Sequence, residues 1–135
     1  MNKGLIAGIA VLVLIVLGIY FLGSSSNVTG NVVSEGKQDN TKSFVITSSH
    51  LKFYIDGVEN PEIRVKEGDK VRIDFTSEEG FHDWRLDEFG AATEKVNPGT
   101  PTSVEFVANK KGTFEYYCSV GKHRALGMKG VFIVE

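Results

Sequence analysis

The chain has 135 residues, a formal net charge of −2 and 41% hydrophobic residues, so it has room for one ordinary domain and little more. The near balance of 15 basic and 17 acidic residues argues against a basic nucleic-acid-binding domain. A single cysteine excludes an intrachain disulfide.

The N-terminal segment, residues 1–23, is predicted to anchor the chain in a membrane. From Leu5 to Leu22 it holds 18 uncharged, apolar or glycine residues, and a helix of that length is about 27 Å long, close to the hydrocarbon thickness of a bilayer. Lys3 precedes the stretch and the next basic residue is Lys37, so the N terminus is expected in the cytoplasm. A cleaved signal peptide is the alternative, because small residues follow at 23–26. Both interpretations export the main domain.

Residues 24–42 are predicted to form a flexible linker. They are rich in Ser, Asn, Thr and Gly and show no sustained hydrophobic period. A coil of this length has a reach of about 25 Å, which would let the domain move above the membrane while it stays tethered. Asn27-Val28-Thr29 is a sequon for N-glycosylation, and its use depends on the host.

Residues 43–135 are predicted to form an all-β sandwich. Short apolar runs recur at roughly ten-residue spacing with turn residues between them, which is typical of a sandwich or barrel. The runs lie at residues 44–46, 51–55, 63–65, 71–75, 104–106, 114–118 and 131–134. The clearest is 71–75, where apolar and polar residues alternate strictly. No convincing helix follows the anchor, although the stretch 88–96 is ambiguous.

Four residues of the predicted sandwich form a candidate metal site: His82, Cys118, His123 and Met128. The last three follow the spacing Cys-x4-His-x4-Met, between the end of one predicted strand and the start of the next. Two imidazoles, a thiolate and a weak axial thioether are the ligand set of a blue-copper electron-transfer site. Soft sulfur favours Cu(I) and imidazole serves both oxidation states, so the set suits a one-electron couple.

At these residues the sequence resembles the cupredoxin family, in particular the plastocyanin-like small blue copper proteins. The resemblance covers roughly 44–135 and is densest in GTFEYYCSVGKHRALGMKGVFIVE, residues 112–135, while Phe81-His82-Asp83-Trp84 is similar to the family's first histidine site. It implies a Greek-key β-sandwich or barrel of about seven or eight strands. It also implies one type 1 copper ion with His82, Cys118 and His123 as equatorial ligands and Met128 as the axial ligand. The family commonly has Asn after the first histidine, where this chain has Asp83, whose ionised carboxylate accepts hydrogen bonds and donates none.

These features predict a membrane-tethered electron carrier rather than an enzyme. Its partners would be redox proteins of a membrane electron-transport chain on the extracytoplasmic side, and we expect a monomer. The leading alternative is a protein that delivers or sequesters copper outside the cell. A dinuclear oxidase-type centre is rejected because it needs two cysteines, but association with a respiratory complex stays open. A Cys118–His123 nucleophile leaves Met128 without a role. The last hypothesis is a structural or adhesive sandwich without a metal.

Some nearby residues receive separate expectations. His50 lies outside the ligand pattern and is interpreted as a surface or structural residue. Trp84 is predicted to lie in the core. Lys122, Arg124 and Lys129 surround the ligand loop, which favours a partner with an acidic docking patch or, equally, ordinary solvated charges.

Overall fold

The computed structural model describes residues 40–135, which form ten β-strands and one short 3-10 helix. In chain order the strands are β1 (Thr41–Ser49), β2 (Lys52–Ile55), β3 (Val58–Glu59), β4 (Ile63–Val65), β5 (Lys70–Ser77), β6 (Arg85–Leu86), β7 (Ala91–Ala92), β8 (Pro101–Val107), β9 (Gly112–Tyr117) and β10 (Lys129–Val134). The 3-10 helix η1 (Asp87–Phe89) lies between β6 and β7.

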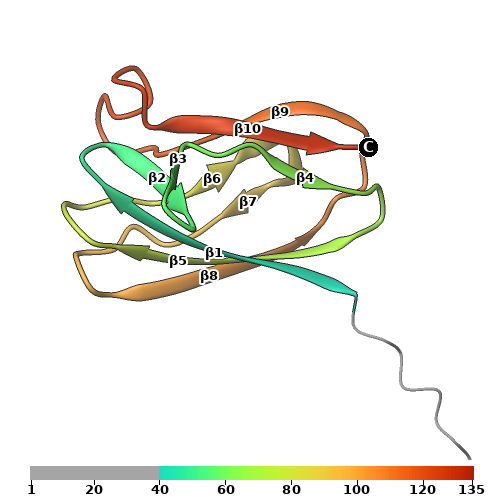
Figure 1. Cartoon of the computed structure of the whole chain (residues 1–135), viewed down its shortest axis with the longest axis horizontal. Coiled ribbons are helices and arrows are strands. Elements are labelled where there is room, and N and C mark those ends of the chain that lie inside the picture. The colour runs from blue at the N-terminus through green and yellow to red at the C-terminus, as the bar shows by residue number, and fades with distance from the viewer. Residues whose placement is uncertain (1–39) are drawn as a thin grey trace, which may run out of the picture. The chain divides into compact units, whose positions relative to one another are not determined.

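The strands form two five-stranded mixed sheets, which Figure 1 shows as two layers. One has the order β3-β2-β1-β5-β8, and the other has the order β4-β10-β9-β6-β7. The pairs β1/β5 and β4/β10 are parallel, and the remaining pairs are antiparallel. The prediction of an all-β sandwich is therefore confirmed for the described residues.

Alternating side chains explain how the two layers share one core. In β5 the inward residues Val71, Ile73 and Phe75 are buried, while the residues between them are more exposed. This period of two matches a strand that has one face in the core and one face toward solvent. Phe132 on β10, in the opposite layer, is fully buried and belongs to the same cluster.

Aromatic side chains fill the centre of the sandwich beneath the metal-ligand segments. Phe53 meets Tyr116 and Phe75 edge to face, with ring centroids 5.4 Å and 6.1 Å apart. Trp84 stacks on Tyr116 at 5.7 Å and is fully buried, so its predicted place in the core is confirmed. These ring contacts pack the core tightly around Tyr116, which precedes Cys118 by two residues.

The strand count differs from the seven or eight that were expected. The seven apolar runs fall on β1, β2, β4, β5, β8, β9 and β10, and the additional strands β3, β6 and β7 have two residues each. Pairs this short carry no hydrophobic period, so the sequence pattern does not reveal them. The ambiguous stretch 88–96 contains the end of η1 and β7, and β1 begins at Thr41, two residues before the expected domain boundary.

Among residues 40–135 no helix is long and apolar enough to cross a membrane. The predicted anchor, residues 1–23, lies outside the described residues, as does most of the predicted linker.

Two connections meet at one end of the sandwich. Figure 1 shows the loop between β9 and β10 and the turn between β1 and β2 at the end opposite the C terminus. All the predicted metal ligands except His82 lie at or within that β9–β10 loop. The fold therefore concentrates the candidate chemistry at this end.

Candidate metal centre

Cys118 and Met128 sit at the two ends of the β9–β10 loop. Cys118 follows the last residue of β9, and Met128 precedes the first residue of β10. The amide N–H of Cys118 donates to the carbonyl of Met128 at 3.1 Å, which closes the loop at its base. Both residues are almost completely buried, so the sulfur-bearing side chains lie inside the protein.

His82 comes from the connection between β5 and β6. Its backbone forms an isolated bridge with Val96, with hydrogen bonds in both directions at 2.8 Å and 3.2 Å. The hydroxyl of buried Ser77 donates to the carbonyl of Gly80 at 2.8 Å, so the turn that precedes His82 is fixed to the end of β5. These contacts hold the imidazole with only 3% of the residue exposed.

His123 lies in the middle of the loop and is half-buried. Its amide N–H donates to the carbonyl of Val120 at 3.0 Å, and its carbonyl accepts from the amide N–H of Met128 at 3.0 Å. The loop therefore turns back on itself and brings the His123 ring next to Cys118.

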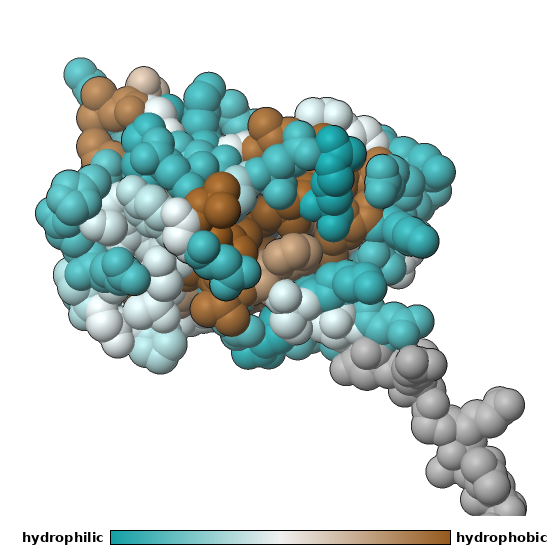
Figure 2. Space-filling model, viewed as in Figure 1, coloured by the Kyte–Doolittle hydropathy of each residue, from teal (hydrophilic) through white to brown (hydrophobic). Residues whose placement is uncertain are grey.

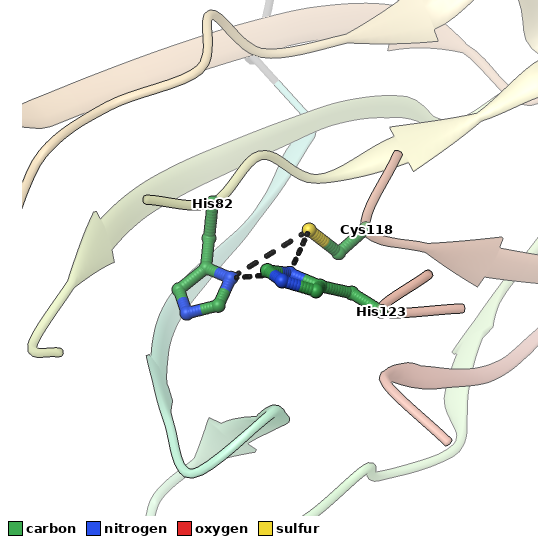
Figure 3. A group of neighbouring side chains, drawn as sticks. All are labelled: His82, Cys118 and His123. Carbon is green, nitrogen blue, oxygen red and sulfur yellow. Dashed lines mark hydrogen bonds between the residues drawn. The ribbon is translucent and has the colours of Figure 1, made fainter. Parts of the chain in front are cut away.

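The three strongest donor atoms converge, as Figure 3 shows for the sulfur and the two rings. Cys118 Sγ lies 3.5 Å from His123 Nδ1 and 3.7 Å from His82 Nδ1. The two Nδ1 atoms are 3.1 Å apart. Each imidazole thus presents the same ring nitrogen to the sulfur.

This triangle has the right size for a bound metal ion. Three atoms separated by 3.1 Å, 3.5 Å and 3.7 Å share a point about 2 Å from each of them. Metal–nitrogen bonds are about 2.0–2.1 Å and metal–thiolate bonds about 2.3 Å. One buried thiolate and two imidazoles in a trigonal arrangement are the donors that copper prefers in electron-transfer sites. The residues present therefore fit copper.

Burial sets the protonation of the ligands before metal binds. It lowers the pKa of His82, and the neighbouring His123 ring lowers it further. Burial also raises the pKa of the Cys118 thiol to about 11, although backbone hydrogen bonds from Asp83 and Val120 act in the opposite direction. His82 is therefore ready to bind a metal as neutral imidazole, whereas Cys118 must first lose a proton.

Asp83 joins the two ligand-bearing segments. Its carboxylate is buried and accepts a hydrogen bond from the amide N–H of Ser119 at 2.6 Å and another from the Ser119 hydroxyl at 2.5 Å. Because Asp83 follows His82 and Ser119 follows Cys118, these two bonds fix the spacing between the first histidine and the cysteine. In both bonds the Asp83 carboxylate is the acceptor, so this contact needs no donor from Asp83.

Asn60 is a second tie, which the sequence pattern did not reveal. Its side-chain oxygen accepts from the amide N–H of Phe53 at 3.0 Å, and its side-chain nitrogen donates to the carbonyl of Gly127 at 3.2 Å. Gly127 precedes Met128, so Asn60 links the β2–β3 region to the base of the ligand loop. The only sequence signal is the Asn-Pro pair at 60–61, which marks a turn.

An open hollow of about 330 Å³ lies beside the two histidines. It is lined by His50, Leu51, Glu79, Gly80, Phe81, His82, Val120 and His123. His50, which the sequence placed outside the site, therefore shares a surface feature with both imidazole ligands. Its place could not be inferred from ligand spacing, because it enters from the β1–β2 turn.

The surface around the ligand loop combines apolar and charged groups. Phe81 and Leu126 are exposed large hydrophobic residues, and Figure 2 shows hydrophobic surface at this end of the molecule. Arg124 donates to Glu115 at 2.7 Å, and Lys129 pairs with the same carboxylate at 3.0 Å. Two of the three basic residues noted in the sequence are thus partly neutralised by one acid.

A family model for copper-binding proteins of the plastocyanin/azurin family matches residues 40–135. A search of curated protein sequences found no significant match.

Solved structures of the same fold include auracyanins and rusticyanin. An auracyanin from Roseiflexus castenholzii is 24% identical, covers 69% of this chain and 96% of its own, and has a TM-score of 0.58. Auracyanin A from Chloroflexus aurantiacus is 21% identical over 70% of this chain and 99% of its own, with a TM-score of 0.58. Rusticyanin from Thiobacillus ferrooxidans is 22% identical over 71% of this chain and 78% of its own, with a TM-score of 0.60. At these identities the likeness shows the fold.

The family match spans most of the chain and covers every residue of the candidate site. It agrees with the donor set that the structure brings together at one end of the sandwich. The chain therefore belongs to the plastocyanin/azurin family of copper-binding proteins, and His82, Cys118, His123 and Met128 are arranged as a type 1 copper site.

Proposed function

We propose that this protein is a membrane-tethered electron carrier whose copper domain lies on the extracytoplasmic side. The observation that carries the proposal is the convergence of the Cys118 sulfur with two imidazole Nδ1 atoms at 3.5 Å and 3.7 Å. Bound copper would supply a one-electron Cu(II)/Cu(I) couple. Blue copper proteins typically serve in electron transfer, and the structural relatives include a dithionite-reduced auracyanin and a reduced rusticyanin.

The residues around the copper would speed electron transfer and leave no coordination position for a substrate. Cys118 and His82 are held by the sandwich and by Asp83, so the ligand positions need little adjustment between the two oxidation states. Met128 would complete the set as the axial ligand, and with four protein donors no position stays open for a substrate. We therefore propose an electron-transfer role without an enzymatic reaction.

His123 is the proposed point of electron entry and exit. It is half-buried, whereas His82 and Cys118 are nearly inaccessible. Exposed Phe81 and Leu126 give apolar surface of the kind that a small, transient redox interface uses. We propose redox proteins of a membrane electron-transport chain as partners. Lys122 would favour a partner with an acidic patch, and the monomer would be the active form.

Membrane attachment is proposed from the sequence of residues 1–23. The apolar stretch from Leu5 to Leu22 is long enough to span a bilayer, and the flanking charges favour a cytoplasmic N terminus. Fractionation of cells that express the full chain tests this part: carbonate-resistant membrane association is expected, and a freely released protein would contradict it.

A visible absorption spectrum tests the electron-carrier function. The full-length chain, purified in detergent, is loaded with Cu(II), reduced with ascorbate and reoxidised. We expect an intense thiolate-to-copper band that bleaches on reduction and returns on oxidation. A colourless protein that binds copper tightly would overturn electron transfer and favour copper delivery or sequestration.

A further inference from the structure

The hollow beside the copper centre carries a group of donor atoms at its mouth that the type 1 site does not use. His50 and Glu79 line the hollow together with the two ligand histidines. Their side chains are 80% and 61% exposed. The outer donors are therefore open to solvent, whereas the His82 side of the same hollow is buried.

The atoms of this group are spaced like the ligands of one cation. His50 Nδ1 and Glu79 Oε2 are 3.6 Å apart, which is long for a hydrogen bond. Ser49 Oγ is hydrogen-bonded to the nitrogen at 2.7 Å and donates to the carboxylate oxygen at 3.3 Å, so a bound cation would replace these two hydrogen bonds. An ion about 2 Å from each donor fits between atoms at these separations. An imidazole nitrogen with a carboxylate oxygen suits Cu(II), and the absence of sulfur makes the group a weaker site than the centre.

The backbone that presents His50 is unusual. His50 and Leu51 form the two-residue turn between β1 and β2, and both have positive φ, 50° and 60°. Turns of this kind normally use Asn and Gly, because larger side chains are strained there. Both side chains line the hollow together with His82 and His123. Backbone strain of this kind is concentrated at functional sites.

We propose that Ser49, His50 and Glu79 form an entry site, which captures Cu(II) and passes it to His82 and His123 in the same hollow. The imidazoles of His82 and His123 replace the outer donors one at a time. Cys118 then binds as thiolate and releases its proton to solvent. The copper remains Cu(II) throughout, so loading needs no reductant. This inference rests on the copper centre proposed above and is independent of electron transfer.

The test follows copper loading of the full-length apo-protein in detergent, at limiting Cu(II), by the growth of the thiolate-to-copper band. His50→Asn removes the imidazole but keeps a residue that tolerates positive φ, so the turn is preserved. Glu79→Gln removes the carboxylate charge. Glu88→Gln is the matched control. Glu88 is a half-exposed acid that does not line the hollow, and its carboxylate lies 3.5 Å from Lys110 Nζ.

We expect loading to slow about tenfold in His50→Asn and in Glu79→Gln, which is the scale of effects seen when groups beside a metal site are removed. The final band should match wild type, and Glu88→Gln should load at the wild-type rate. A second equivalent of Cu(II) added to the loaded wild type should give a second EPR signal with nitrogen coupling, and His50→Asn should lack it.

The readouts separate the entry site from the copper centre. Equal loading rates in wild type and His50→Asn would overturn the entry site, whether or not a second signal is present. Absence of the blue band in every variant, including Glu88→Gln, would instead contradict the copper centre and with it the entry site.

Discussion

His82 and His123 reach the copper site from segments with very different surroundings. His82 is bonded in both directions to Val96 and is almost inaccessible. His123 belongs to a loop whose middle is mostly exposed and whose hydrogen bonds are local, such as Leu126 N–H to the Lys122 carbonyl at 3.0 Å. His82 is thus held by a segment distant in sequence, and His123 by contacts within a single loop.

The difference shows how one site combines rigidity with access. The buried half fixes the ligand geometry, because moving the His82 backbone would break its hydrogen bonds to Val96. The loop half can expose the edge of His123 to a partner, because its ends are fixed by the Cys118–Met128 hydrogen bond and by the Asp83–Ser119 contacts. Variants that disturb each half separately test this division.

Cys118→Ser should have the largest effect, since Cys118 lies where the two halves meet. A hydroxyl does not replace a thiolate as a soft copper ligand, so we expect complete loss of the intense visible band. The change buries one hydroxyl and should lower the free energy of unfolding of the apo-protein by only about 1–3 kcal/mol. Visible spectra and thermal unfolding measure the two effects, and a retained blue band would contradict the ligand assignment.

Gly80→Ala should disturb the buried half. Gly80 has a φ of +84°, and a Cβ there would lie 2.7 Å from His82 Nε2. The ring would have to move away from the position that places its Nδ1 3.7 Å from Cys118 Sγ, so we expect copper affinity to fall about 10- to 100-fold. Competition with a chelator measures the affinity.

Gly121→Ala is the matched control for Gly80→Ala. Gly121 also has a positive φ, +49°, but a Cβ there meets nothing within 4 Å. Gly121→Ala therefore introduces a strained backbone without a collision with His82, and the copper affinity of this variant should stay close to wild type. Equal losses in the two variants would show that strain, and not the position of His82, determines the affinity.

The sequence predicted the half of the site that is local and missed most of what supports the other half. Cys118, His123 and Met128 could be found because five-residue spacing within one loop is visible in the chain. His82 was found by its residue type and by family resemblance, since no local pattern links it to Cys118. The positions of Asn60 and His50 beside the ligand segments depend on which turns the topology brings together, and a one-dimensional pattern does not contain that information.

Copper affinity should rise with pH because of the buried sulfur. Burial raises the pKa of Cys118 to about 11 and lowers that of His82. Above neutral pH the thiol therefore still holds the proton that copper binding must release, while His82 has none to release. We expect affinity to increase about tenfold per pH unit between roughly pH 7.5 and 9. Chelator competition at several pH values measures the slope, and Cys118→Ser should lose it.

The same raised pKa has a consequence for the apo-protein. The unfolded chain ionises its thiol at the ordinary pKa, below that of the folded chain, so above that pH the unfolded state binds fewer protons. The contribution of Cys118 to stability is therefore fully present below the ordinary thiol pKa and declines as the pH rises toward 11. If neither the copper affinity nor the free energy of unfolding changed with pH, the raised pKa of the buried Cys118 thiol would be contradicted.

Asp83→Asn should have the smallest effect, because it keeps the link between the two halves and changes only its charge. The amide oxygen still accepts from the Ser119 amide, and the amide nitrogen donates to the Ser119 hydroxyl, which reverses one bond. Loss of a negative charge beside the copper destabilises Cu(II) more than Cu(I). We therefore expect the reduction potential to rise by up to about 60 mV, equivalent to a tenfold change for a one-electron couple.

Asp83→Ala separates the link from the charge. It removes the same charge but leaves the Ser119 amide N–H without its partner, which should lower the free energy of unfolding by about 1–3 kcal/mol. Redox titration and thermal unfolding of both variants measure the two contributions. If Asp83→Asn lowers the potential, the charge argument is wrong. If both variants unfold like wild type, the Asp83–Ser119 contacts do not stabilise the link between the two halves, and the carboxylate acts on the copper through its charge alone.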